Sequence, residues 1–189
     1  MLTRQHAGTR ARLGRAAAII ALATTALLGA SLAPAGAAAA PPKLMPVKGF
    51  TYVKAPAEFN SFVTLLKSTG YVTGATIKGA KYKKDVQVVV LLAQYNAKIT
   101  KGLDKLSIKK VLDGATSGLV AIAGNKKVKD YAMVGTHVRA IDLNGITVVV
   151  TYIKGGKLLE LFAPTSKSVL AYSALYLASA KAHGQKLAK

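Results

Sequence analysis

Apolar residues alternate along the second half of the chain, and turn residues interrupt the alternation. Residues 130–142 and 146–154 are predicted strands, and Asn144-Gly145 between them is typical of a two-residue type I′ hairpin turn. Gly155-Gly156 predicts a second two-residue turn into a strand over residues 157–163. The pattern therefore predicts a three-stranded antiparallel meander.

Two-residue turns would also set the register of this meander. Arg139 would lie opposite Val150, and Tyr152 would lie opposite Leu159. With this register both faces of the meander are largely apolar. We therefore expect that helices cover both faces, or that one face holds a ligand or a partner.

The preceding region mixes strands and helices. Strands are predicted near residues 50–53, 71–78 and 86–95, and the last of these is apolar on both sides, as a central strand would be. Apolar spacing of three and four predicts helices over about 56–70 and 104–123, and another after Pro164. We expect an α+β fold: an antiparallel sheet with a C-terminal three-strand meander, packed by about three helices.

The N-terminal 39 residues have the layout of a signal peptide. Four arginines precede an apolar run over residues 16–33, and small residues follow as far as Ala40. A retained membrane anchor is the alternative, although the run is short and rich in alanine. We expect cleavage within Ala37–Ala40, a protein secreted to the exterior or the cell wall, and no transmembrane segment after cleavage. The expected organisation is a signal peptide at 1–39, a Pro-rich linker at 40–49, one α+β domain at 50–182 and a basic, frayed tail at 183–189.

The net charge of the chain restricts the possible partners more than its overall composition does. Without residues 1–39 the chain has 23 basic and 7 acidic residues, a net charge of +16, and 22 of the basic residues are lysine. Lysine is a hydrated point charge, whereas arginine reads phosphates and base edges with a planar fork. We therefore expect attraction to an anionic wall polymer or lipid headgroup and no specific nucleic acid, with plain solubility as the alternative.

Six lysines fall in two loops that flank the central strand and the central helix. If that helix runs antiparallel to the strand, both loops lie toward one end of the domain and form a single anion-binding patch. Its predicted members are Lys81, Lys83, Lys84, Lys126, Lys127 and Lys129.

The inventory of reactive residues is small. The chain has no Cys, which excludes disulfides, thiolate metal sites and a Cys nucleophile. No metal-binding, nucleotide-binding or nucleophile motif occurs, so we predict no catalytic, cofactor-binding or metal-binding residues and no enzyme activity. His137, Arg139 and Tyr152 are the polar group on one apolar sheet face. They either line a pocket for an anionic headgroup or form a boundary cluster.

The order of elements resembles the PsbP-like family of small exported bacterial proteins. The residues that carry the resemblance are the Asn144-Gly145 hairpin, the Gly155-Gly156 turn and the closing helix SVLAYSALYLASA. The chain departs from many exported relatives because it lacks the lipobox Cys. The resemblance implies binding or scaffolding rather than catalysis. We therefore expect a secreted, non-catalytic binding or accessory protein that associates with anionic cell-envelope surfaces; the alternative is a carrier of a small apolar or lipid ligand bound between sheet and helices.

Overall fold

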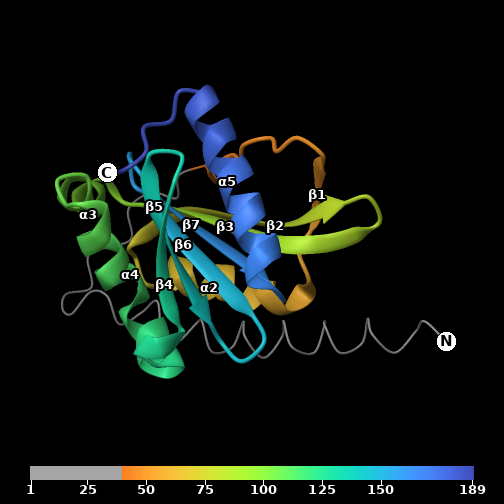
Figure 1. Cartoon of the computed structure of the whole chain (residues 1–189). Helices are drawn as coiled ribbons and strands as arrows, with labels where there is room; N and C mark the ends of the chain where they lie inside the picture. The colour runs from red at the N-terminus through yellow and green to blue at the C-terminus, as the bar shows by residue number, and fades with distance from the viewer. Residues whose placement is uncertain (1–39) are drawn as a thin grey trace.

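Seven antiparallel strands form one sheet in the computed structural model, which describes residues 40–189 (Figure 1). The strand order across the sheet is β1-β2-β3-β7-β6-β5-β4. The α+β fold is confirmed, while the predicted signal peptide lies outside the described residues. The strands are β1 (Phe50–Lys54), β2 (Val72–Tyr82), β3 (Asp85–Tyr95), β4 (Val128–Met133), β5 (Thr136–Asp142), β6 (Thr147–Ile153) and β7 (Lys157–Ala163).

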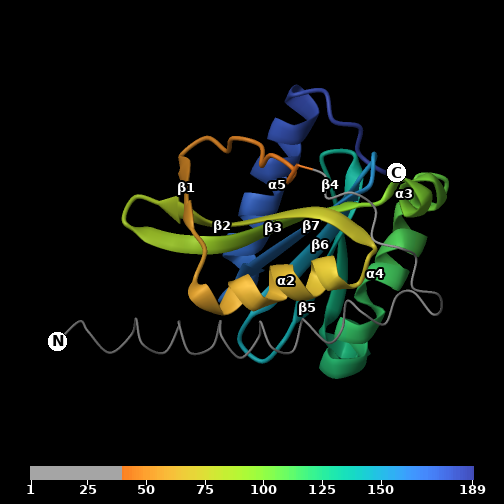
Figure 2. The ribbon, with the colours of Figure 1, turned by 180° about the vertical axis from the view of Figure 1, so that it is seen from behind.

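Helices cover both faces of this sheet. They are α2 (Asn60–Ser68), α3 (Ala97–Leu103), α4 (Ile108–Ala123) and α5 (Ser166–Ala182). Figure 2 shows α2 and α4 over one face, with α5 on the opposite face. Side chains of Asn96, Ser107 and Thr165 accept hydrogen bonds from the first turns of α3, α4 and α5, which explains where these helices begin. Across residues 40–189, none of the helices is long and apolar enough to cross a membrane.

The central strands are apolar on both sides because both sides are covered. In β3, Val88, Val90 and Leu92 contact the core beneath α5, and the intervening residues Val89 and Leu91 contact the core beneath α2 and α4. All five side chains are almost fully buried. The prediction of a doubly covered central strand is confirmed.

The C-terminal meander has four strands instead of the predicted three. The stretch 130–142 was expected to be one strand, but a two-residue turn at Val134-Gly135 divides it into β4 and β5. Both turn residues have positive φ, 56° for Val134 and 85° for Gly135. A β-branched residue is strained at positive φ and is not expected in a turn of this kind. The sequence around Val134 therefore predicts a continuous strand, although the chain reverses there.

The second predicted turn is one residue longer than expected. The Asn144-Gly145 hairpin has the predicted register, with Arg139 opposite Val150. Between β6 and β7, however, Ile153 pairs with Lys157 across a three-residue loop.

This extra residue changes which side chains of β7 lie on each face of the sheet. The predicted pairing of Tyr152 with Leu159 is wrong, because Tyr152 pairs with Leu158. A shift of one residue turns every side chain of a strand to the other face. Glu160 therefore faces α2 and α4, opposite Val150, together with Leu158 and Phe162.

Both flanking segments belong to the folded body. Residues 40–47 form neither helix nor strand and residues 48–49 form a turn into β1, but Val47 is buried against the α5 core. The Tyr52 hydroxyl donates a hydrogen bond to the Met45 carbonyl (2.7 Å), and the Ser179 hydroxyl donates one to the Pro46 carbonyl (2.5 Å). These contacts join the segment to β1 and α5.

The prediction of a frayed C-terminal tail is wrong. Leu187 forms an antiparallel bridge with Ile153, and Ala188 is buried in the core beneath α2 and α4. The Ile108 amide at the start of α4 donates a hydrogen bond to the main-chain oxygen of Lys189 (2.9 Å). The tail is therefore fixed between the end of β6 and the start of α4.

The β6–β7 loop offers a matched pair of glycines for a stability test. Both Gly155 and Gly156 have positive φ (89° and 81°), but a Cβ on Gly155 would meet open space, whereas one on Gly156 would overlap the Thr100 side chain. We expect Gly155→Ala to destabilise by about 1 kcal/mol through backbone strain alone. Gly156→Ala should destabilise by roughly 1–3 kcal/mol more, through overpacking. Urea unfolding of both variants measures the difference, and equal losses would mean that the loop does not pack on α3.

Candidate functional site

A pocket lies between α2, α3, α4 and the sheet, and we call it the α2–α4 pocket. Its floor is formed by β3 and β7, and its enclosed volume is about 40 Å³. Most of its lining is apolar. The lining residues are Leu66, Thr69, Tyr71, Val72, Ala93, Tyr95, Ile99, Leu103, Val111, Ala115, Leu158 and Glu160.

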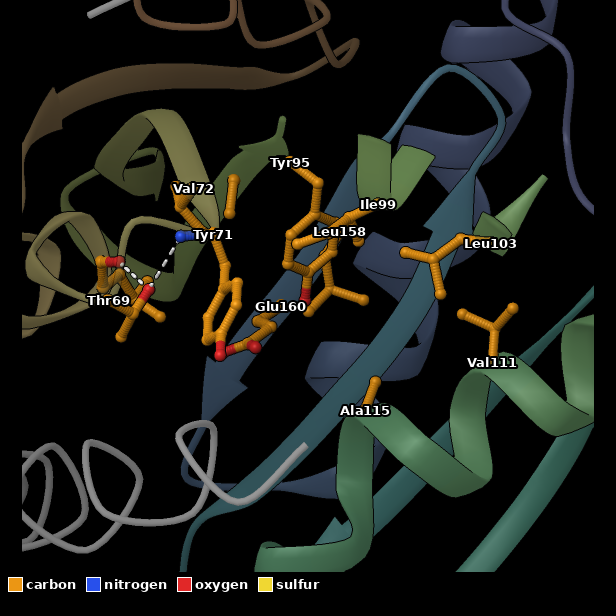
Figure 3. A pocket seen from close by; sticks show the side chains of 12 residues that line it. Thr69, Tyr71, Val72, Tyr95, Ile99, Leu103, Val111, Ala115, Leu158 and Glu160 are labelled. Atoms are coloured by element: carbon orange, nitrogen blue, oxygen red, sulfur yellow. Dashed lines mark hydrogen bonds between the residues drawn. The ribbon is translucent and has the colours of Figure 1, made fainter. Parts of the chain in front are cut away.

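Glu160 is the acidic residue among the described residues that line this pocket. Its strand β7 is held between β3 and β6, where it pairs with Leu91 and Val150, and its residue exposure is only 2%. Its Oε2 atom has no hydrogen-bond partner within residues 40–189. Figure 3 shows the side chains of Tyr71 and Glu160 pointing toward one another, with Tyr95 beside them. A buried carboxyl oxygen is therefore available at the base of an apolar pocket.

Burial changes the protonation of this site. Removal from water raises the pKa of Glu160 from its ordinary value of 4.5 to about 7. Burial also raises the pKa of Tyr95, and the negative charge of ionised Glu160 raises it further, so Tyr95 stays protonated at neutral pH. The pocket consequently holds two kinds of hydrogen-bond donor at neutral or mildly acidic pH: a phenol and a carboxylic acid.

These groups place hydrogen-bond donors inside an apolar pocket. A protonated carboxyl group donates one hydrogen bond, and the surrounding aliphatic side chains exclude water from it. Among the described residues, no group of three or more His, Cys, Asp or Glu side chains could hold a metal ion. The pocket can therefore orient an apolar molecule that carries one polar group.

One wall of the pocket is fixed by Tyr152 and Asp104. The Tyr152 hydroxyl donates a hydrogen bond to Asp104 Oδ1 (2.7 Å) and accepts one from the Gly156 amide (3.1 Å). The Gly155 amide also donates to Asp104 Oδ1 (3.1 Å). Because Asp104 follows Leu103 directly, these bonds tie the end of α3, and with it a lining residue, to the β6–β7 loop.

Arg139 belongs to a separate ion-pair network between α4 and the strands β4 and β5. Its Nε and Nη2 atoms donate to the two carboxylate oxygens of Asp130 (2.7 and 2.9 Å). Nη2 also lies 2.8 Å from Asp113 Oδ1, and Nη1 donates to the Thr116 hydroxyl (3.2 Å). The hydrogen bond from Arg139 lowers the pKa of Asp130. With these partners, Arg139 holds β4 and β5 to α4.

The predicted trio of His137, Arg139 and Tyr152 does not meet in one pocket. The His137 side chain is exposed, Arg139 bonds to acids of α4 and β4, and Tyr152 bonds to Asp104. The three side chains therefore have separate surroundings, and Arg139 forms ion pairs that the sequence did not indicate.

The six predicted anion-binding lysines lie in two places. Lys81 is near the end of β2 and Lys83 and Lys84 form the β2–β3 turn, whereas Lys126, Lys127 and Lys129 lie around the start of β4. Both groups are at the same end of the strands, as expected, but β7, β6 and β5 separate β3 from β4. Four strand spacings amount to about 19 Å, more than twice the screening length of about 8 Å at physiological salt. The two groups are therefore separate patches.

Glu160 was not among the site residues predicted from the sequence. The signal that identifies it is a single acid in the apolar run Leu158–Phe162, a position where an unpaired charge is costly. The positions of Tyr71 and Tyr95 beside Glu160 carried no such signal, because they depend on the packing of distant strands in the sheet.

Comparisons with models of protein families, with curated proteins and with solved structures found no match.

The raised pKa of Glu160 predicts how stability depends on pH. A carboxyl whose pKa is higher in the folded state stabilises the folded form while it is protonated, so stability falls as pH rises from about 4.5 to about 7. Glu160→Gln removes this titration. We expect the variant to gain about 1–3 kcal/mol over the parent at about pH 8, relative to their difference at about pH 4.5. Chemical unfolding across this range measures the difference, and two parallel profiles would contradict the assignment.

Proposed function

We propose that this protein binds a small, mostly apolar molecule in the α2–α4 pocket and acts as a non-catalytic carrier or accessory protein. The observation that carries the proposal is Glu160 Oε2, which is buried at the pocket and has no hydrogen-bond partner within the described chain. Such an orphaned atom costs about 1–3 kcal/mol, and an apolar residue at this position of β7 would avoid the cost. A ligand that supplies the missing partner explains why an acid suits this position.

The pocket also restricts the chemistry of the ligand. An enclosed volume of about 40 Å³ accommodates only about three water-sized groups, so a narrow apolar end enters and the remainder leaves between the helices. The protonated Glu160 carboxyl suits a neutral acceptor such as a hydroxyl, ether or carbonyl oxygen. Helix α2 is shorter than α4 and, unlike α3 and α4, has no side-chain cap, so its displacement is the simplest way to widen the entrance.

Export from the cell and the PsbP-like resemblance belong to the same proposal. A signal peptide over residues 1–39 would place the carrier outside the membrane, where apolar molecules need a protein to cross an aqueous space. Binding rather than catalysis is also what the family resemblance implies.

A second candidate function is association with anionic cell-envelope surfaces. The observation that favours it is the state of the lysines: both salt bridges found within residues 40–189 are made by Arg139, and no described lysine side chain forms one. A surface of unpaired cations attracts polyanions, and it does so less strongly as salt rises.

Ligand binding can be tested with a chain-length series of 1-alkanols, which combine an apolar tail with one hydroxyl. We expect amide resonances of Ala93, Ala115 and Glu160 to shift on titration. Ala115→Leu places a larger side chain in the pocket and should weaken binding at least about tenfold, or about 1.4 kcal/mol. Ala121→Leu, on the exposed side of the same helix, is the matched control and should bind like the parent.

A melting curve confirms that each variant is folded before its affinity is compared. Equal affinity of the two leucine variants would show that alkanols bind elsewhere and would overturn the pocket assignment. Native mass spectrometry of the exported protein then identifies the natural ligand by the mass that it adds.

A further inference from the structure

A groove lined by lysines lies at the end of the sheet opposite the β2–β3 turn. Its volume is about 600 Å³, and three segments far apart in the sequence form it: the β4–β5 turn at Val134-Gly135, the β6–β7 loop and the C-terminal segment from Lys181. Four lysines line it, and among its described lining residues there is no Asp or Glu. We call it the lysine groove, and its lysines are Lys154, Lys181, Lys186 and Lys189.

The walls of this groove are built by specific contacts. The Lys154 amide donates a hydrogen bond to the Lys186 carbonyl (2.9 Å), next to the bridge between Ile153 and Leu187. The Lys157 ammonium donates to the Gln185 side chain, and the Gln185 amide donates to the Ala180 carbonyl (2.9 Å). These bonds hold the C-terminal segment against β6, β7 and the end of α5. The lysines therefore project from a fixed backbone, which lowers the ordering cost of binding.

The opposite wall is a strained turn. Val134 lines the groove with a φ of 56°, a conformation that β-branched residues rarely adopt. Strain of this kind persists where surrounding structure enforces it, and it gathers at functional positions.

Acidic side chains within residues 40–189 do not neutralise the charge of the groove. In this part of the chain none of its four lysines takes part in a salt bridge. The main-chain oxygen of Lys189 accepts a hydrogen bond from the Ile108 amide at the start of α4 (2.9 Å). Charges of one sign in a concave surface focus the electrostatic potential and attract counter-ions of opposite sign.

We propose that the lysine groove binds a linear polyanion built on phosphate groups. Lysine holds phosphate as a point charge without demanding a fixed geometry, which suits a flexible chain. The concave shape favours such a chain over a flat bilayer, which would contact only the rim. This inference rests on the second candidate function and locates it away from the six lysines that the sequence indicated.

The test uses the full mature chain and fluorescently labelled linear polyphosphate. Lys154, Lys181 and Lys186 are changed together to Gln, which keeps a polar side chain and removes three charges. The matched control changes Lys83, Lys84 and Lys129 to Gln, three exposed lysines at the opposite end of the strands. Both variants have the same net charge, so any difference between them reports position and not total charge. Melting curves establish that both variants fold.

We expect the groove variant to bind at least tenfold more weakly than the parent at low salt, and the control to bind within about threefold. The slope of log affinity against log salt concentration should fall by about 2 in the groove variant, because each lost phosphate contact removes about 0.7. Equal weakening of both variants would overturn the groove while leaving diffuse polyanion association intact. No binding by the parent would overturn the second candidate function as well. Tighter binding to vesicles of phosphatidylglycerol and phosphatidylcholine than to polyphosphate would favour a bilayer and would also overturn the proposal.

Discussion

The rest of the structure depends on the burial of the sheet on both faces. Strands β3, β6 and β7 carry apolar side chains on each side, so neither face can be left in water without exposing a large apolar surface. Helix α5 and the extended segment before β1 cover one face, and α2 and α4 cover the other. Because α2 and α4 are separate helices on a broad sheet, they leave the pocket between them. Helix α5 ends at Ala182, and the C-terminal segment that follows it turns back along β6.

The register of a single loop determines the chemistry of the pocket. With a two-residue turn, Glu160 would lie on the α5 face, among the side chains that contact Val149 and Ile153. The observed loop, Lys154-Gly155-Gly156, is one residue longer, and it turns Glu160 toward α2 and α4; Gly156 is buried against α3. The same loop supplies the amides that bind Asp104 and Tyr152. One three-residue loop, with two glycines at positive φ, therefore sets both the position of the acid and the wall beside it.

The sequence was sufficient for features that depend on local patterns. Apolar spacing predicted α4, α5 and the central position of β3, and Asn144-Gly145 predicted a hairpin with the observed register. It was not sufficient where distant segments decide the conformation. The Val134-Gly135 turn sits in a residue pattern that favours a strand, and the tail is held by Ile153 and Ile108, which nothing in its own sequence indicates. The α2–α4 pocket and the lysine groove both arise from such long-range contacts.

The charge of the molecule also separates the ligands of its two sites. With 23 basic and 7 acidic residues beyond position 39, the average potential is positive, which favours an ionised Glu160 and opposes the effect of burial. Burial nevertheless raises the pKa of Glu160 to about 7, so desolvation outweighs the positive field. A cationic ligand would have to cross that field and would also need the ionised carboxylate that burial disfavours. A neutral ligand meets neither cost and accepts a hydrogen bond from the protonated acid. Under the two proposals, the positive surface would select anions outside, and the buried acid would select uncharged molecules within.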